Sequence, residues 1–506
     1  MKKRITFAVT AAALAAGALT AVQTGAVAQA ESLLPVRTPR ITWGACPEPP
    51  AGLTVDERQQ CGTLTVPLDY DHPWGRTITL AVSRLPAKKA THGVLFTNPG
   101  GPGGEGLNMP STLTAEVRSR ALDGYDVIGL DPRGVGHSSP VTCDLTLEEM
   151  LPPAQYGSVK ESTAFARSAA RRCQACNGDL LRHVTTADTA RDMDQLRKAL
   201  GAERITYLGR SYGTYLGAVY ASLFPSHTEK MLLDSASDPA QVWYEQLRRQ
   251  SEATATRFPD AARLAVTTGW GRSEKAVTRR YLRLVGQLDR RPVELPGSET
   301  ALSGNVLRFL TFGLLSDDAY LPTLVDSWTT AADLADGTAT AEQASNLAGL
   351  LGAVSPSSSP GVPRDNSVAA AYAVLCGDGG WPGDVKTYAA NVARDREAYP
   401  LSNGAPANVL PCAFWPTRPG KPVKISAAGA RDILILQNER DPNLTVGTAR
   451  GLQKALGNRA ALVTVDAGGH VVYGPGTNAC ATEAAETFLT EGTVPGHDVR
   501  CSTVAG

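Results

Sequence analysis

Short runs of apolar and β-branched residues recur along most of the chain, separated by polar turns or by stretches with helical spacing. Runs typical of buried strands lie at 93–97, 125–130, 204–208, 230–234, 432–437 and 461–465. Apolar positions at helical spacing lie at 186–200, 214–223, 446–456 and 480–489. Strands that alternate with helices in this way predict an α/β protein, with a mostly parallel sheet and helices on both of its faces.

Two regions depart from this alternation. Residues 63–68 and 77–82 flank a polar turn and predict a hairpin at one edge of the sheet. Residues 239–367 contain helical patterns and Ser/Pro-rich joints but no clear strand. We expect them to form a helical cap over the sheet, because such lids commonly shape a substrate pocket. The sheet domain is then built from two parts of the chain, 31–238 and 368–506.

The first thirty residues have a pattern of their own. Positive charges at 2–4 precede an alanine-rich apolar run at 5–22, and Ala28-Gln29-Ala30 follows as an A-x-A cleavage site. This pattern predicts a signal peptide at 1–30, and the small residues at its end argue against the alternative of a membrane anchor. No later stretch is apolar enough to span a bilayer. We therefore expect a secreted protein with no membrane contact after cleavage.

The charge balance argues against one class of partner. Lys and Arg together number 49, and so do Asp and Glu. With no excess of positive charge, the composition does not indicate binding to nucleic acid. No motif predicts a cofactor or a bound metal ion.

Nine cysteines in an exported protein predict a disulfide framework. Proximity along the chain suggests four pairs, with Cys176 left over: Cys46–Cys61, Cys143–Cys173, Cys376–Cys412 and Cys480–Cys501. The spacing of Cys173 and Cys176 also allows a redox or metal-binding pair. No second cysteine pair or close histidine supports that alternative.

The strongest chemical signal is the segment 209–213, Gly-Arg-Ser-Tyr-Gly, which is the chain's one match to G-x-S-x-G. It follows the strand at 204–208 and precedes the helix at 214–223. In this context the motif places a serine on a strained elbow, with its hydroxyl exposed at the edge of the sheet. An ordinary turn with a serine in it is the alternative. The context favours Ser211 as a nucleophile.

A serine hydroxyl needs a base, and the base needs a carboxylate to orient it and to stabilise its protonated form. In sites of this kind the chain order is serine, acid, histidine. Three histidines follow Ser211. His227 comes directly after the elbow helix, and His497 lies in a polar tail. His470 follows a strand and lies in a glycine-flanked loop, so it is the predicted base.

The acid is expected in the loop after the strand that precedes the histidine strand. Asp441 and Glu439 both lie there, whereas Asp432 is at the wrong end of that strand. The Asp-Pro-Asn sequence that begins at Asp441 is typical of a rigid turn that holds a carboxylate inward. Asp441 is therefore favoured over Glu439.

A glycine-rich loop at 98–106 follows the strand at 93–97. No Lys-Ser/Thr pair follows it, which argues against a phosphate-binding loop. We interpret it as an oxyanion loop, in which the backbone N–H groups of Gly101 and Tyr212 face a developing negative charge. A glycine-rich surface turn is the alternative. In the next strand-end loop, Asp131 and Arg133 are expected to lock the turn rather than to take part in chemistry.

Three segments, 98–104, 129–138 and 211–217, carry a resemblance to a known family. They resemble the secreted tripeptidyl aminopeptidases of actinobacteria and, more distantly, the prolyl iminopeptidase group of α/β-hydrolases. The segment 376–501 is similar to the C-terminal part of the first family. The resemblance implies an α/β-hydrolase fold and supports the same three triad positions and an oxyanion hole near Gly101.

The family implies removal of short peptides, and tripeptides in particular, from a free N-terminus. Such an activity requires carboxylates that bind the α-ammonium group, and Glu105 and Asp378 are the candidates; each could instead be a solvated loop acid. The function we expect is a secreted serine exopeptidase. The alternative is a carboxylesterase or other small-molecule hydrolase that acts on a small ester or amide. The intact Ser-Asp-His set argues against a third possibility, a binding protein on an inactive scaffold.

Overall fold

The computed structural model describes residues 40–89, 92–150, 157–298, 300–353, 358–474 and 478–503. Residues from Pro39 onward form one compact unit. The predicted signal peptide at 1–30 lies outside the described residues. None of the described helices is both long enough and apolar enough to cross a membrane.

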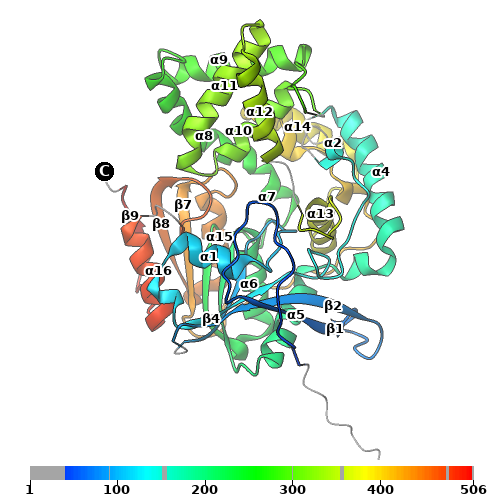
Figure 1. Cartoon of the computed structure of the whole chain (residues 1–506), viewed down its shortest axis with the longest axis vertical. Coiled ribbons are helices and arrows are strands. Elements are labelled where there is room, and N and C mark those ends of the chain that lie inside the picture. The colour runs from blue at the N-terminus through cyan, green and yellow to red at the C-terminus, as the bar shows by residue number, and fades with distance from the viewer. Residues whose placement is uncertain are drawn as a thin grey trace, which may run out of the picture. The chain divides into compact units, whose positions relative to one another are not determined.

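Nine strands form one sheet: β1 Gln60–Pro67, β2 Thr77–Leu85, β3 Gly93–Asn98, β4 Tyr125–Leu130, β5 Ile205–Arg210, β6 Thr228–Asp234, β7 Ile433–Arg440, β8 Ala460–Gly468 and β9 Val499–Cys501. Their order is β1-β2-β4-β3-β5-β6-β7-β8-β9 (Figure 1). The predicted hairpin is β1–β2, which is antiparallel, and β2 is also antiparallel to β4. Every other pair is parallel. Each strand predicted from the sequence is present, whereas the short β9 was not predicted.

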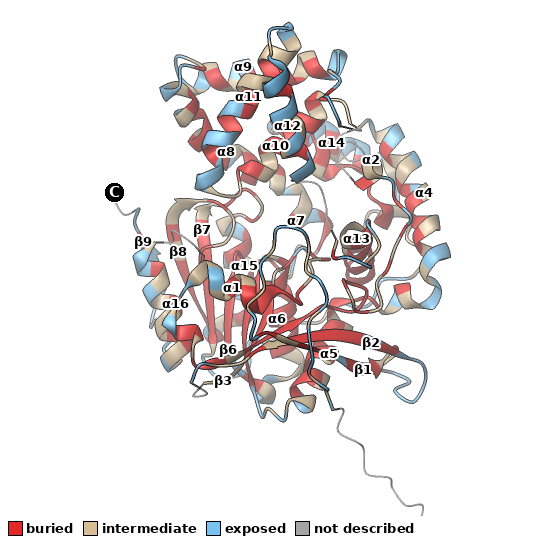
Figure 2. Ribbon diagram, viewed as in Figure 1, coloured by how far each residue is buried: buried red, intermediate tan, exposed pale blue. Residues whose placement is uncertain are grey.

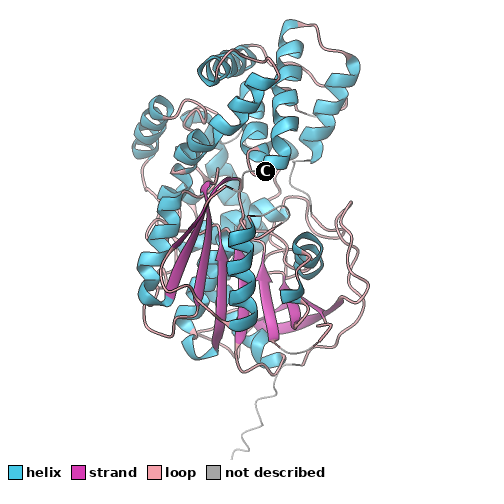
Figure 3. Ribbon diagram, turned by 90° about the vertical axis from the view of Figure 1, so that its left-hand side faces the viewer, coloured by secondary structure: helices cyan, strands magenta, loops and turns pink. Residues whose placement is uncertain are grey.

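Helices cover both faces of the sheet (Figure 3). One face packs against α5 Thr186–Ala199, α6 Tyr212–Leu223 and α15 Val446–Leu456. The other packs against α1 Met109–Val117 and α16 Ala479–Glu491. Neighbouring residues of β5 face opposite layers, and all six residues of this strand are buried. Figure 2 shows that most of the sheet is buried. Burial on both faces is what parallel strands require, and it explains their continuous apolar runs.

The chain between β6 and β7 is helical: α7 Tyr244–Arg248, α8 Gln250–Thr267, α9 Glu274–Arg290, α10 Gly304–Leu314, α11 Leu321–Asp336, α12 Ala341–Ala353, α13 Asn366–Asp378 and α14 Val385–Ala398. The helices α8 to α12 form a hydrophobic core of their own. At its centre the ring of Trp328 lies 5.1 Å from Phe258, 5.2 Å from Tyr281 and 5.5 Å from Trp270, measured between ring centroids. Among the described residues of this region, the one β-type pairing is an isolated bridge between Val293 and Leu302.

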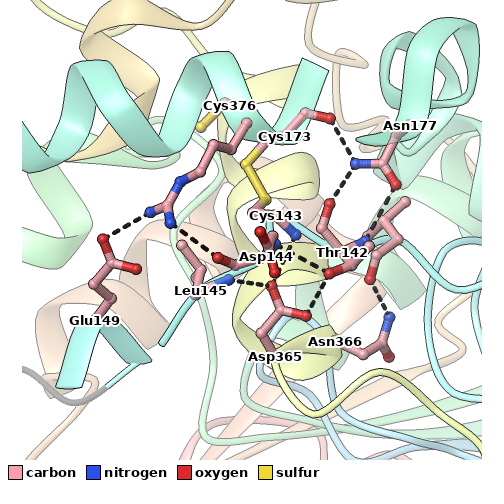
Figure 4. The surroundings of a disulfide bond; sticks show 12 residues. Thr142, Cys143, Asp144, Leu145, Glu149, Cys173, Asn177, Asp365, Asn366 and Cys376 are labelled. Carbon is pink, nitrogen blue, oxygen red and sulfur yellow. Dashed lines mark hydrogen bonds and ion pairs between the residues drawn. A yellow bond between two sulfur atoms is a disulfide. The ribbon is translucent and has the colours of Figure 1, made fainter. Parts of the chain in front are cut away.

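All four predicted disulfides are present, and Cys176 is a free, exposed thiol. The bond between Cys143 and Cys173 joins the chain after β4 to α4 Val159–Asn177, which follows the short helix α2 Leu147–Met150. Figure 4 shows Asp365 beside this bond, where its carboxylate accepts hydrogen bonds from the N–H groups of Cys143 (2.8 Å) and Leu145 (3.1 Å). The start of α13 is therefore fixed to the loop that follows β4.

Candidate active site

Ser211 lies at the turn between β5 and α6. Its φ of 56° and ψ of −122° are rarely adopted by residues other than glycine, and such strain is concentrated at functional turns. The flanking glycines are required sterically, because a Cβ atom on Gly209 would lie 2.4 Å from the carbonyl oxygen of Gly213. The N–H group of Ser211 donates to the carbonyl of Asp234 at 2.8 Å. The predicted strand, sharp turn and helix are present, and the end of β6 holds the turn in place.

The imidazole of His470, on the loop after β8, faces the carboxylate of Asp441, on the loop after β7. Nδ1 of His470 lies 2.9 Å from Oδ2 and 3.1 Å from Oδ1. The Asp441 side chain is fully buried, and its Oδ1 also accepts the N–H groups of Asn443 (2.8 Å) and Leu444 (3.1 Å). The Asp-Pro-Asn turn therefore directs this carboxylate inward, toward the histidine.

The environment of His470 adjusts its affinity for a proton. Burial lowers the pKa of the imidazole, but the charge of Asp441, its hydrogen bond to the ring and the charge of Asp234 together outweigh burial, so the pKa is raised above its ordinary value of 6.5. A histidine with a raised pKa is a stronger base once it is deprotonated. His470 and Asp441 therefore have the arrangement of a general base and the acid that orients it, as found in serine hydrolases.

The rival residues have other partners. The carboxylate of Glu439 pairs with the guanidinium of Arg500 at 2.6 and 2.8 Å. His227 lies just beyond the far end of α6, and its Nδ1 contacts Asp194 at 2.7 Å. Neither side chain is directed toward Ser211 or His470 by these contacts.

Two residues that sequence reasoning did not single out hold the histidine loop. Both carboxylate oxygens of Asp234 accept backbone N–H groups, those of Val472 and Tyr473, each at 2.8 Å. The side-chain amide of Asn438 donates to the carbonyls on either side of His470, at 3.1 and 3.0 Å. The acid at the end of an apolar strand was a visible signal for Asp234, but no motif connected it with the histidine loop.

The helical region between β6 and β7 also contacts this loop. The N–H group of His470 donates to the carbonyl of Ser316, just after α10, at 2.7 Å. Arg440, next to Asp441, pairs with Asp260 of α8 at 2.9 Å. The base and the acid are therefore both fastened to the segment that we call the cap, α8 to α12.

The loop after β4 braces the glycine-rich loop after β3. Oδ1 of Asp131 accepts the N–H groups of Gly106 and Leu107, each at 2.8 Å. Arg133 is fully buried and forms a two-pronged ion pair with Asp192, at 2.6 and 2.7 Å. As predicted, Asp131 and Arg133 lock their turn.

The glycine-rich loop passes directly over the elbow. A Cβ atom on Gly100 would lie 3.0 Å from Cβ of Ser211 and 3.3 Å from the backbone nitrogen of Tyr212. Gly101 follows and is exposed. Tyr212 is the first residue of α6, where a backbone N–H has no acceptor within the helix. The loop thus brings Gly100 against Ser211 and Tyr212, and Gly101 is the next residue of the loop.

Ser211, Asp441 and His470 follow β5, β7 and β8, which lie in a parallel part of the sheet, so all three residues occupy the same edge. Within the described residues, no hydrogen bond joins the hydroxyl of Ser211 to the imidazole of His470. Such bonds are often long in the absence of substrate and shorten when it binds.

The two carboxylates predicted to bind a substrate ammonium lie in different environments. Glu105 is half-buried, and its carboxylate accepts hydrogen bonds from the N–H group (3.0 Å) and the hydroxyl of Ser359. Asp378 is buried, with 6% of its surface exposed. Its carboxylate accepts hydrogen bonds from Thr186 and from the indole N–H of Trp243.

The fold and this site place the protein in the α/β-hydrolase class. A family model described as "alpha/beta hydrolase fold" matches residues 93–312, and one described as "TAP-like protein" matches residues 399–501. The chain is 33% identical to "Tripeptidyl aminopeptidase" of Streptomyces coelicolor over 88% of its own length and 83% of that protein. It belongs to the tripeptidyl aminopeptidase family and is a serine hydrolase.

Other relatives show the breadth of this group. The chain is 30% identical to "Serine protease Hip1" of Mycobacterium tuberculosis, over 91% of each chain. It is 32% identical to "Carboxylesterase B" of the same organism, over 92% of this chain and 91% of that one. Proteins named as peptidases and as an esterase therefore match this chain over most of its length.

Proposed function

We propose that the protein is a secreted serine exopeptidase that removes short peptides, tripeptides in particular, from free N-termini. The observation that carries the proposal is the contact between His470 and the buried carboxylate of Asp441, on a loop held at the sheet edge where the strained turn presents Ser211. The similarity to a tripeptidyl aminopeptidase supports a peptide substrate. Four disulfides are consistent with an extracellular protein.

The proposed chemistry uses an acyl-enzyme. The hydroxyl of Ser211 attacks the carbonyl carbon of the scissile bond while His470 accepts its proton, and Asp441 stabilises the imidazolium that forms. The backbone N–H groups of Tyr212 and Gly101 stabilise the oxyanion. His470 then gives the proton to the leaving amine. Water attacks the acyl-enzyme with His470 again as base, which releases the peptide and restores Ser211.

An aminopeptidase must also bind the α-ammonium group of its substrate. We assign this role to Glu105, whose half-buried carboxylate lies on the oxyanion loop; its described hydrogen-bond donors are the neutral N–H and hydroxyl groups of Ser359, and it also interacts electrostatically with His137. An ammonium group would add a charge-assisted hydrogen bond to it. Asp378, the other candidate, is buried behind Thr186 and Trp243 and has a different role, which is argued below.

A carboxylesterase is the second candidate, because a relative of that name matches almost the whole chain. Three substrates separate the possibilities: a tripeptide p-nitroanilide with a free amine, its N-acetylated form, and a short-chain p-nitrophenyl ester. Turnover of the free-amine anilide with at least about tenfold lower kcat/KM for the acetylated form supports the exopeptidase. Ester turnover alone supports the esterase. A folded protein that turns over none of them supports a binding function.

The Glu105→Gln variant tests the ammonium site. It removes the negative charge but keeps the shape, so we expect KM for the free-amine anilide to rise by about tenfold, while turnover of the ester changes by less than about twofold. The Glu116→Gln variant is the control, because Glu116 pairs with Arg210 near the elbow but lies outside the glycine-rich loop. Equal losses on the anilide and the ester would contradict the assignment of Glu105.

A further inference from the structure

A chain of buried hydrogen bonds connects Asp378 to the elbow. Oδ1 of Asp378 accepts the N–H group of Thr186 at 2.8 Å, and its Oδ2 accepts the Thr186 hydroxyl at 2.5 Å. The Thr186 oxygen lies 2.7 Å from the hydroxyl of Tyr212. Trp243 donates its indole N–H to Oδ2 at 3.3 Å. All four side chains are at least nine-tenths buried, so water does not compete for these bonds.

Which group donates in each of these hydrogen bonds follows from counting the protons. The Thr186 hydroxyl has one proton, and it donates that proton to the carboxylate of Asp378. The hydroxyl of Tyr212 must then be the donor to Thr186, because the oxygen of Thr186 can only accept at that contact. The carboxylate therefore fixes the orientation of Thr186, and Thr186 in turn fixes the position of the Tyr212 ring.

Tyr212 is the residue whose side chain is best placed to hold the elbow. It directly follows Ser211, and its own backbone N–H is one of the two proposed oxyanion donors. The Tyr212 ring packs against Trp243 with centroids 5.7 Å apart, and Trp243 packs edge-on against Tyr215 at 5.0 Å. The ring and the backbone N–H belong to one residue, so a shift of the ring tilts the N–H group. The bond from the Ser211 N–H group to Asp234 and the bond from Tyr207 to the Gly213 carbonyl also hold this strained turn, and the Tyr212 ring adds a contact on the side of α5.

Asp378 is the last residue of α13, and this helix also braces the glycine-rich loop on the other side of the proposed oxyanion hole. A Cβ atom on Gly103 would lie 2.2 Å from the carbonyl oxygen of Ser367 in the first turn of α13, so the glycine-rich loop rests on this helix. Asp365 fixes the start of α13 to the chain beside a disulfide, as Figure 4 shows, and Cys376 is linked to Cys412 at its end. The helix thus contacts the glycine-rich loop directly and is connected to the elbow through Thr186.

We propose that Asp378 is a positioning residue that acts through Thr186 and Tyr212 to hold the backbone N–H beside Ser211 in the orientation that stabilises the oxyanion. This inference rests on the proposed function of Ser211 and deepens it. The carboxylate touches no reacting atom in this scheme. It also satisfies the N–H group of Thr186, the first residue of α5, which has no acceptor within that helix.

The groups around Asp378 set the ionisation of its carboxyl. From α5 it faces Thr186 and the negative charge of Asp188, from α6 the rings of Tyr212 and Tyr215, and from the chain before α7 the indole of Trp243. Burial raises the pKa of the carboxyl to about 6, although the bonds from Thr186 oppose the shift. At about pH 8 the group is therefore ionised, and kinetic tests of its role belong at that pH.

The matched pair Thr186→Val and Thr186→Ser tests the proposal. Valine has the shape of threonine without the hydroxyl, whereas serine keeps the hydroxyl and loses only a methyl group. At about pH 8, we expect Thr186→Val to lower kcat by about tenfold, with KM changed by less than about twofold, because oxyanion stabilisation acts on the transition state. Thr186→Ser should keep at least half of the wild-type kcat. All rates are normalised to titrated active sites, so that loss of folded protein does not count as loss of catalysis.

Tyr212→Phe supplies an independent test, because it removes only the last hydroxyl of the chain. We expect a loss similar to that of Thr186→Val, and no further loss when the two are combined, since either one breaks the same connection. Wild-type kcat in Thr186→Val, an equal loss in Thr186→Ser, or additive losses in the double variant would overturn the proposal. If the wild-type protein itself turns over neither anilide nor ester, it is the proposed function that fails.

Discussion

The sheet domain and the cap have separate hydrophobic cores, and they differ in what they contribute to the candidate site. The sheet core is built from alternating strand residues, and the loops at one of its edges hold Ser211, Asp441 and His470. The cap core is an aromatic cluster around Trp328, and it supplies none of the proposed catalytic side chains. Rigid strands fix side chains to within fractions of an ångström, as chemistry requires. The cap has a separate core, and it reaches the catalytic loops through a few described contacts.

The described contacts between the cap and the catalytic loops are polar. The carbonyl of Ser316 accepts the N–H group of His470, and Asp260 pairs with Arg440. Polar contacts of this kind depend on geometry, whereas apolar packing depends mainly on the area buried. Changes in the sheet loops should therefore abolish chemistry, and changes at the cap contacts should only weaken it.

The largest effect is expected from Ser211→Ala. Removal of the nucleophile should lower kcat by about 10⁶-fold on the anilide and the ester alike. The melting temperature should not fall, since the substitution removes one half-buried oxygen from a strained turn. A loss of less than about tenfold would show that the nucleophile lies elsewhere. Titration with a serine-reactive phosphonate, which should label the wild-type protein only, is the matching measurement.

Asp441→Asn should come next, with a loss of about 10⁴-fold in kcat, because the amide cannot stabilise the imidazolium of His470 and favours the wrong tautomer. Glu439→Gln is the matched control two residues earlier. Its carboxylate pairs with Arg500 instead, so this variant should stay within about twofold of the wild type. A large loss in the Glu439 variant with a small loss in the Asp441 variant would show that Glu439, and not Asp441, is the acid that orients His470.

The pH profile gives a graded effect. A protonated imidazole cannot accept the proton of Ser211, so kcat/KM should fall by about tenfold per unit of pH below the pKa of His470. The carboxylate of Asp441 raises that pKa above 6.5, which places the midpoint of the fall above 6.5. In Asp441→Asn the residual activity should show a lower midpoint. A flat profile down to about pH 5 would contradict the role of His470 as base.

The smallest effect is expected at the cap contact. Arg440→Gln breaks the pair with Asp260 but leaves Asp441 in place, so kcat/KM should fall by about three- to tenfold. Arg500→Gln is the control, because its pairs with Glu439 and Asp466 do not reach the cap and should contribute little. A loss as large as that of Asp441→Asn would show that the cap belongs to the catalytic machinery, against the comparison drawn above.

The candidate site could be predicted in part because its signals are local. The turn around Ser211 needs glycines at fixed positions, and the Asp-Pro-Asn turn at Asp441 directs a carboxylate through bonds to the next few residues. The disulfides could be predicted because only cysteines can form them and each bond joins two cysteines that follow one another in the sequence. Asp234 and Asn438 could not be assigned, because their partners lie 31 or more residues away and no turn or period marks them.

Asp378 shows the same limit in another form. Its place after a cysteine was visible, and a carboxylate near the site predicted a contact with substrate. Its hydrogen-bond partners in the structure, Thr186 and Trp243, are separated from it by 192 and 135 residues. Burial, which decides whether a carboxylate meets substrate or supports a neighbour, is a property of the packed chain and not of the local sequence.

The amino-acid sequence by itself determined the alternation of strands and helices and the strained turn at Ser211, because each depends on residues near one another along the chain. The acid, the histidine and the cysteine pairs could also be predicted, because their residue types and their positions after strands mark them. Only the tertiary structure decided which loops meet at the sheet edge, which carboxylate is buried, and where the cap touches the histidine. Those outcomes depend on contacts between distant segments, and their geometry is set when the two cores pack.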